Sequence, residues 1–485
     1  MLKKSVKLNA VLNVIKSLLS VIFPLISYPY VTRVLGVENL GKINYGSSII
    51  TYFSLFAAFG ITSYAIREGS KIRDDKKAFN RLSSELFSIN LITTLISYCL
   101  LAISIFAVHR LENYRLLIAL QSLTIIFTTL GVDWINTIYE DYLYITIRGI
   151  ATNLISLIAL FLFVKSADDY YIYAMLVVLS NAVVCLWNYF YCKKYVRFKL
   201  TVNSEQKKHI KKMSVFFVNS VAVSVYVGAD IIMLGWMVGD YSVGIYSVAV
   251  KIYAIMKLVL AAIYSVTLPR LSYFVSHNKD IEYRKLITKV ISAILILLLP
   301  AVAALLTLSR EIVLVIGGEN FIAASSTLKI LSIALLFAIL GGIITQCINI
   351  SLGLEKINAQ ATIVSALENM LLNIPFIMVL HENGAAITTA ISELTVLIFC
   401  VIKGKQALQN IDKKSLKVNL FHSLIGVLTV TVTSFIVHAL FSSVWMVLIS
   451  AFVISISIYA FFLILLKNDL TLGIVHRVIG KVKKQ

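Results

Sequence analysis

Ionisable side chains inside long apolar stretches are the residues of this chain that could do chemistry, because charge is costly in an apolar environment. The stretches carry charges of both signs. The candidates among their ionisable residues are Lys16, Arg33, Asp133, Arg148, Asp230, Lys251, Lys257, Glu368 and Glu393. The cations could hold an anionic ligand, and the carboxylates could exchange a proton or a small cation.

Two pairs of opposite charge are predicted by spacing. Asp133 lies eight residues before a predicted turn near Asp141 and Arg148 lies seven after it, so the two side chains sit at similar depth on neighbouring spans. Asp230 and Lys251 lie ten and eleven residues on either side of a later turn, close to mid-membrane. Each pair can be a purely structural ion pair, or it can open and close as a gate.

Three more residues are candidates for a site. Lys257 lies six residues after Lys251 and has no obvious acidic partner in the sequence, so it is a candidate unpaired cation in a cavity. Glu368 and Glu393 are candidate coupling sites for H⁺ or Na⁺. A helix cap or a hydrogen bond to a neighbouring helix would explain these two carboxylates equally well.

The first apolar stretch, residues 8–36, is unusual because it contains Pro24 and Pro29. Each proline removes a backbone donor and clashes with the carbonyl group one turn earlier, so we expect the helix to kink or open in mid-span. Lys16 and Arg33 lie on either side of this break. They can snorkel to opposite membrane surfaces, or they can line a positively charged central cavity.

The composition is that of a membrane protein. Of the 485 residues, 59% are hydrophobic and 14% are charged, and so little polar surface could not cover a soluble globule of this size. The five scattered cysteines suit small buried hydrophobes. The sequence has no phosphate-binding glycine loop, metal-spaced cluster or nucleophile motif, so we expect no enzymatic activity and no bound cofactor or metal.

Windows of about 20 apolar residues predict an all-α polytopic protein with about 14 spans. The predicted spans are 8–36, 41–66, 82–107, 115–139, 143–165, 170–192, 214–238, 241–268, 286–307, 322–352, 358–380, 384–403, 418–440 and 443–467. Most of the 44 Lys and Arg residues fall in alternate connections, which predicts a cytoplasmic location for that side and for both termini. The net charge of +20 is therefore a topology signal and no footprint for nucleic acid.

The sequence also predicts two similar halves. The pattern Leu-Gly, then Gly, then Tyr follows the first span at residues 35–45 and the seventh at residues 234–246. Six spans separate the two, so the halves would share one orientation and be related by an axis along the membrane normal. We predict an N-terminal lobe at 1–212, a C-terminal lobe at 213–416, and two extra helices with a basic tail at 417–485.

Four blocks of sequence carry a family resemblance along the chain: PLISYPYVTRVLGVENLGKINY (24–45), GVDWINTIYEDYLYITIRGI (131–150), GADIIMLGWMVGDYSVGIYSVAVKIY (228–253) and LPRLS (268–272). They resemble the corresponding blocks of the bacterial lipid-linked oligosaccharide flippases of the O-antigen and capsule type, often called Wzx. That family belongs to the multidrug/oligosaccharidyl-lipid/polysaccharide (MOP) flippase superfamily, which also holds multidrug and toxin extruders and peptidoglycan-precursor flippases.

The resemblance implies two six-helix lobes around a central cavity, plus two C-terminal helices. It implies that an oligosaccharide on undecaprenyl pyrophosphate moves from the cytoplasmic to the outer leaflet of the bacterial cytoplasmic membrane by alternating access. The polysaccharide polymerase and the chain-length machinery become candidate partners. A pyrophosphate needs cationic company in a low dielectric, which Lys16, Arg33, Lys251 and Lys257 would supply.

Two other functions compete with this interpretation. A multidrug or cation antiporter on the same fold would need an acidic cavity, whereas the first span offers Lys16 and Arg33 and no carboxylate. An integral-membrane polysaccharide polymerase or ligase would be expected to carry a sizeable outer loop with catalytic groups, and the predicted outer connections are mostly a few residues long.

Overall fold

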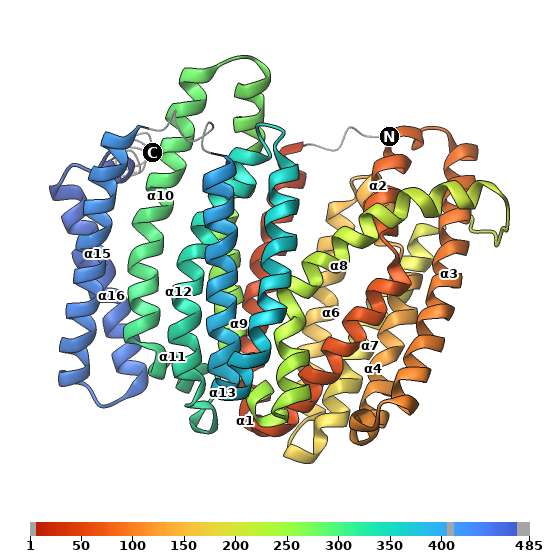
Figure 1. The fold of residues 1–485 in the computed structure, drawn as a ribbon, viewed down its shortest axis with the longest axis horizontal. Helices are drawn as coiled ribbons and strands as arrows, with labels where there is room; N and C mark the ends of the chain where they lie inside the picture. The colour runs from red at the N-terminus through yellow and green to blue at the C-terminus, as the bar shows by residue number, and fades with distance from the viewer. Residues whose placement is uncertain (1–5, 405–411, 473–485) are drawn as a thin grey trace. The chain divides into compact units, whose positions relative to one another are not determined.

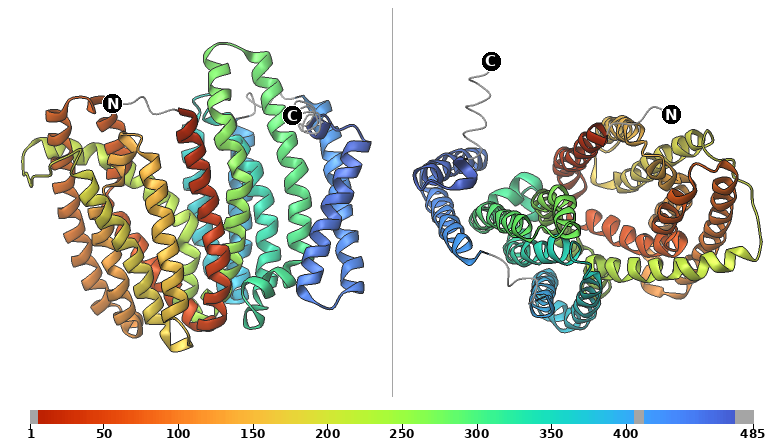
Figure 2. Two further views of the ribbon diagram at one scale, coloured as in Figure 1. Left: turned by 180° about the vertical axis from the view of Figure 1, so that it is seen from behind. Right: turned by 90° about the horizontal axis from the view of Figure 1, so that it is seen from above.

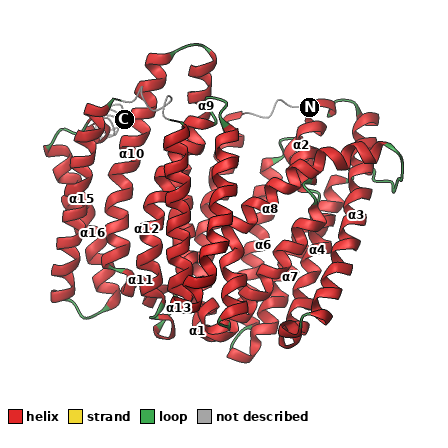
Figure 3. Cartoon of the chain, in the orientation of Figure 1, coloured by secondary structure: helices red, strands yellow, loops and turns green. Residues whose placement is uncertain are grey.

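The computed structural model of the chain describes residues 6–404 and 412–472. Within these ranges the chain forms helices joined by loops and turns, without any strand (Figures 1 and 3). The all-α fold predicted from the composition is therefore confirmed.

The chain divides into two compact units, Met1–Gly244 and Ile245–Gln485. The helices of the first unit are α1 (Val6–Ala58), α2 (Ile61–Ile72), α3 (Lys76–Ala107), α4 (Arg115–Gly131), α5 (Asp133–Ile138), α6 (Tyr142–Phe163), α7 (Tyr170–Cys192) and α8 (Glu205–Met237). Within this unit α8 runs obliquely and contacts α1, α2 and α3 (Figures 1 and 2). The predicted lobe boundary at residue 212 falls inside α8, and the assignment of lobes stays a prediction.

The second unit begins within the first turns of α9 (Asp240–Ser276). It continues with α10 (Asp280–Thr307), α11 (Ser309–Ile316), α12 (Ala324–Gly342), a π-helical segment (Ile343–Asn349), α13 (Glu355–Lys403), α15 (Lys413–Leu440) and α16 (Val444–Leu465). In this unit α12 packs on α13, and α15 packs on both α10 and α16.

Twelve helical segments among the described residues are long and apolar enough to cross a membrane. The two longest helices, α1 and α13, each contain a residue with non-helical dihedral angles, Gly36 and His381, where φ is 73° and 52° respectively. Each of these two segments therefore has two arms, in agreement with the roughly fourteen crossings that the sequence predicts.

The break in α1 lies at Gly36, where the predicted spans 8–36 and 41–66 meet, and not at the prolines inside the first span. Within the described length of α1, the residue with non-helical dihedral angles is Gly36, whereas Pro24 and Pro29 lie inside the helix. The helix therefore does not open at the prolines, and a kink at Pro24 or Pro29 stays a prediction. Proline fixes φ near a helical value, while only glycine reaches the φ of 73° and ψ of −179° of Gly36 without a steric penalty.

The glycines of the repeated pattern make close backbone contacts in the first unit. A Cβ atom on Gly41 would collide with the backbone of Asp240, and one on Gly244 would collide with the carbonyl oxygen of Val37. The ring of Tyr45 covers Gly235 in the same way. The turn after Gly36 thus packs directly on the turn between α8 and α9.

Two predicted spans are interrupted. Val132 adopts a left-handed conformation with φ 41° and separates α4 from α5, so the predicted span 115–139 is not one helix. The predicted span 322–352 ends in the π-helical segment at 343–349. A β-branched residue is poorly suited to the left-handed conformation, so the sequence around Val132 gave no reason to expect a break.

Large apolar side chains cover the outer surfaces of the helices. Phe106 of α3, Val379 of α13 and Phe435 of α15 are each more than 70% exposed. Exposure on this scale would be an aggregation hazard in water, but it suits helices that face lipid.

Candidate functional site

The first candidate site is built around Asp133 and Arg148, which the structure brings together as their spacing predicts. Arg148 Nη2 of α6 donates a hydrogen bond to Asp133 Oδ1 of α5 at 2.9 Å. The break at Val132 makes Asp133 the first residue of α5. The Arg148 side chain is 4% exposed and that of Asp133 is 58% exposed, so the carboxylate faces open space while the guanidinium is buried.

Two buried asparagines hold this carboxylate in position. Asn188 Nδ2 of α7 donates to Asp133 Oδ1 at 2.8 Å and also to the carbonyl oxygen of Gly131. Asn136 donates to the side-chain oxygen of Asn188. Asn136 and Asn188 are fully buried, so buried amide groups join α4, α5 and α7 beneath the exposed carboxylate.

Asp141 lies in the turn between α5 and α6, at the opposite end of α5 from Asp133. It accepts hydrogen bonds from the hydroxyl groups of Tyr191 at 2.5 Å and Tyr195 at 2.8 Å, and Lys194 Nζ lies 3.5 Å from it. Burial, followed by the hydrogen bond to Asp141, raises the pKa of Tyr195, which therefore remains a proton donor at neutral pH. The turn that carries Asp133 is thereby fixed from both sides.

A polar cavity of about 530 Å³ opens beside Asp133 within the first unit. The polar side chains among its lining residues come from α2 to α7 and are Thr62, Asn90, Thr128, Thr129, Asp133, Thr152, Asn153, Ser180 and Asn181. A smaller cavity of about 360 Å³ shares Asn153 and reaches Pro24 and Ser27 of α1. Hydroxyl and amide groups of this kind can exchange hydrogen bonds with a polyhydroxylated ligand.

The second candidate site lies in the second unit, where the expectation that Lys257 lacks an acidic partner is wrong. Lys257 Nζ of α9 lies 2.6 Å from Glu393 Oε1 of α13. The hydroxyl group of Tyr253, one turn before Lys257, donates to the same oxygen at 2.9 Å. The two charged residues are 136 positions apart, so helix periodicity around Lys257 could not show the contact. The site joins a candidate cavity cation to a candidate coupling carboxylate.

The remaining predicted site residues are not gathered into one place. Asp230 is buried on α8 in the first unit and Lys251 is half-buried on α9 in the second, so their pairing stays a prediction. Arg33 is exposed on α1 and donates from Nη1 to the carbonyl oxygen of Pro29 at 2.7 Å. Lys16 lies on α1, but its side chain is outside the described part of the structure. Glu368 Oε2 is buried with no hydrogen-bond partner among the described residues.

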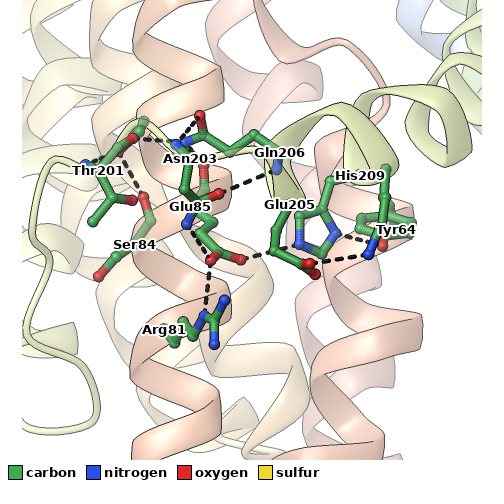
Figure 4. Close-up of polar contacts among 11 residues, drawn as sticks. Tyr64, Arg81, Ser84, Glu85, Thr201, Asn203, Glu205, Gln206 and His209 are labelled. Carbon is green, nitrogen blue, oxygen red and sulfur yellow. Dashed lines mark hydrogen bonds and ion pairs between the residues drawn. The ribbon is translucent and has the colours of Figure 1, made fainter.

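Sequence reasoning missed a third cluster, centred on Glu85 of α3 (Figure 4). His209 Nε2 of α8 lies 3.1 Å from Glu85 Oε2, and its Nδ1 is 2.7 Å from the hydroxyl group of Tyr64. Asn203 Nδ2 and Arg81 Nε donate to Glu85 Oε1 at 2.7 and 3.0 Å. The available signal in the sequence was a Glu, Glu85, near the start of the predicted span 82–107.

This cluster also fixes the connection between α7 and α8. Backbone N–H groups of Lys199 and Thr201 donate to the hydroxyl groups of Ser84 and Ser88 on α3 at 3.1 and 3.0 Å. Gln206 Nε2 donates to the carbonyl oxygen of Thr201 at 2.7 Å. The connection between α7 and α8 is thus hydrogen-bonded to α3 at several points, and we assign the Glu85 cluster a structural role.

The broken membrane helices, the half-buried ion pairs and the polar cavity define a multi-pass helical membrane protein with polar groups in its interior. A family model described as "Polysaccharide biosynthesis protein" matches residues 6–275, more than half of the chain. The chain therefore belongs to this family, which confirms the family resemblance of its sequence blocks.

Similar proteins agree with this assignment. The capsular polysaccharide biosynthesis protein CapF of Staphylococcus aureus is 26% identical over 379 residues, which cover 74% of this chain and 89% of CapF. The lipid II flippase MurJ in an inward closed conformation matches 97% of this chain and 99% of its own, with a TM-score of 0.77 and 16% identity. An inward-facing multidrug resistance MATE transporter of the MOP superfamily matches 79% of this chain and 93% of its own, with a TM-score of 0.61 and 16% identity. The two structures establish the fold alone.

Proposed function

We propose that the protein is a flippase that moves an oligosaccharide on undecaprenyl pyrophosphate from the cytoplasmic to the outer leaflet of the bacterial cytoplasmic membrane. The polar cavity beside Asp133 carries the proposal, because it lies inside the helices matched by the polysaccharide biosynthesis family. Its Asn, Ser and Thr side chains offer both donors and acceptors, which suits the hydroxyl groups of a sugar. These groups are compatible with many sugars and do not specify one repeat unit.

The proposed topology places both termini in the cytoplasm. Its support is the basic composition of the connections between α2 and α3, between α7 and α8, and between α13 and α15. The polymerase and the chain-length machinery of the same polysaccharide are the proposed partners, since they would use the flipped product.

The proposed coupling carboxylates are Glu393 and Glu368. Glu393 is buried against Lys257, so uptake of H⁺ or Na⁺ by its carboxylate would compete with that ion pair and would free the lysine. Such an exchange would link an ion gradient to the exposure of a cation that suits a pyrophosphate.

The cavity can be tested in liposomes that contain a fluorescent undecaprenyl-pyrophosphate oligosaccharide, with an impermeant reagent to report its arrival on the far leaflet. We expect Asn153→Leu combined with Thr128→Val to slow arrival by at least about tenfold, because two sugar-binding groups are lost. Thr51→Val, which changes an exposed threonine of α1 outside the cavity, is the matched control. Arrival at the wild-type rate in the cavity variant would remove this cavity from the transport path.

A further inference from the structure

A second large cavity lies at the end of the second unit where α10, the start of α15 and the chain after α16 meet. Its volume is about 810 Å³, which is in the range of pockets that hold small ligands. The lining is strongly basic: its cations are Arg284, Lys285, Lys289, Lys414 and Lys467. The pocket shares no lining residue with the cavity beside Asp133, and neither Lys257 nor Glu393 lines it.

The positive charge of this basic pocket is largely uncompensated. Within residues 6–404 and 412–472, no ion pair or side-chain hydrogen bond is formed by any of its five cations. The lining carboxylates are Asp412 and Asp469. Asp412 is engaged as the N-cap of α15, because it accepts from the backbone N–H groups of Lys414 and Ser415. Five exposed cations without an ion pair, gathered around one pocket, give it a positive potential that attracts an anion.

The inner wall of the basic pocket is formed by buried, hydrogen-bonded polar side chains. Asn468, which is 3% exposed, donates to Asn419 Oδ1 at 2.9 Å and contacts His422 Nδ1 at 2.8 Å. Its own oxygen accepts from the backbone N–H groups of Leu470 and Thr471. His422 is 6% exposed, and its Nε2 atom has no hydrogen-bond partner among the described residues although the side chain lines the pocket. The pocket is therefore lined by side chains held in place by hydrogen bonds, and His422 Nε2 is available to a ligand.

The position of the basic pocket along the helices indicates what kind of anion it meets. It is formed by the N-terminal ends of α10 and α15 and by the C-terminal end of α16, which the distribution of Lys and Arg assigns to the cytoplasmic side. Long apolar faces of α15 and α16 lead away from it, with Phe421, Leu424 and Phe462 exposed. A ligand at this level would have its charged group among the lysines and its acyl chains along these helices.

We propose that this basic pocket binds the phosphate group of an anionic lipid. Basic pockets between membrane helices on the cytoplasmic side hold lipid phosphates by charge-assisted hydrogen bonds. The phosphate could come from an anionic phospholipid of the membrane or from the pyrophosphate of a polyprenyl carrier. The site does not rest on the proposed transport function, since binding requires no translocation.

The test is lipid retention by the purified full-length protein, measured by native mass spectrometry. The probes are dioleoyl phosphatidylglycerol, dioleoyl phosphatidylcholine and undecaprenyl pyrophosphate. The test variant changes Lys285, Lys289 and Lys467 together to Gln, and a second variant changes them to Arg. The matched control changes Lys207, Lys211 and Lys212 of α8 to Gln, which removes the same charge from exposed lysines that the structure leaves without an ion pair.

We expect the Gln variant to bind phosphatidylglycerol at least about tenfold more weakly, while the Arg variant and the α8 control retain it. Phosphatidylcholine should be unaffected in every protein. Pocket-dependent retention of undecaprenyl pyrophosphate alone would support the site and identify the polyprenyl carrier as its source of phosphate. Equal loss of both anionic lipids from the pocket variant and the α8 control, or no loss of either anionic lipid from either variant, would overturn the proposal. Equal melting temperatures of the variants serve as the folding control.

Discussion

At the scale of single residues, the two ion pairs of the candidate sites differ in how they are exposed. The cation is buried in the Asp133–Arg148 pair, whereas the carboxylate is buried in the Lys257–Glu393 pair. Removal of the exposed partner leaves the buried charge uncompensated, which costs more than removal of both. This asymmetry predicts which substitution in each pair is the more damaging.

Asp133→Asn should therefore destabilise the protein more than Asp133→Asn combined with Arg148→Met. The single change leaves a buried guanidinium without its carboxylate, at a cost of roughly 3 kcal/mol, and the double change removes that charge. Thermal unfolding in detergent measures the difference. A double variant no more stable than the single one would contradict the asymmetry.

Lys257→Met should also lower stability, but by only about 1–2 kcal/mol, because the 37% exposure of Lys257 allows its environment to screen part of the interaction. Adding Glu393→Gln should restore most of the loss, and Tyr253 would still donate to the new amide oxygen. A double-mutant cycle on the melting temperature checks this. Strictly additive losses would mean that the two residues do not interact.

At the scale of elements, the turn after Gly36 depends on backbone conformation and not on space. A Cβ atom on Gly36 would meet nothing within 4 Å, but its φ of 73° with ψ of −179° is a region reached essentially by glycine alone. At Gly244 the limit is space, since an added Cβ atom would collide with the carbonyl oxygen of Val37.

Gly36→Ala is expected to cost on the order of 1–3 kcal/mol through strain alone. Gly149→Ala is the matched control, because a Cβ atom there also meets nothing within 4 Å and its position in α6 is helical. Chemical denaturation in mixed micelles would compare the two. Equal stabilities of these variants would show that the turn tolerates an ordinary residue.

The Glu85 cluster predicts how firmly the connection between α7 and α8 is held. His209→Ala should speed tryptic cleavage within residues 193–204 several-fold, because Glu85 and Tyr64 lose their link to α8. His277→Ala removes an exposed histidine of the second unit and should leave the rate unchanged. Equal cleavage rates in the two variants would rule out this anchoring role.

The sequence could predict what depends on local spacing. The helical spans, the turn at Gly36 and the contact between Asp133 and Arg148 follow from hydropathy and hairpin geometry. The contact between Lys257 and Glu393 could not be predicted, because it depends on how α9 packs against α13. The break at Val132 was also hidden, since a valine with φ 41° is held there by its surroundings and against its own preference.

At the scale of the whole molecule, the chain is a membrane protein of the polysaccharide biosynthesis family with a polar cavity among the matched helices. Transporters of related fold carry different cargo, since MurJ is a lipid II flippase and the MATE structure is a multidrug resistance transporter. The cargo is therefore the central claim to test, and the fold alone does not decide it.

The most direct test uses one batch of proteoliposomes with two cargoes. One set contains a labelled undecaprenyl-pyrophosphate oligosaccharide in one leaflet, and the other contains a fluorescent cationic drug, with and without H⁺ or Na⁺ gradients. We expect protein-dependent arrival of the oligosaccharide on the far leaflet and no movement of the drug. Gradient-driven efflux of the drug without oligosaccharide arrival would contradict the flippase function and favour a cation antiporter on the same fold.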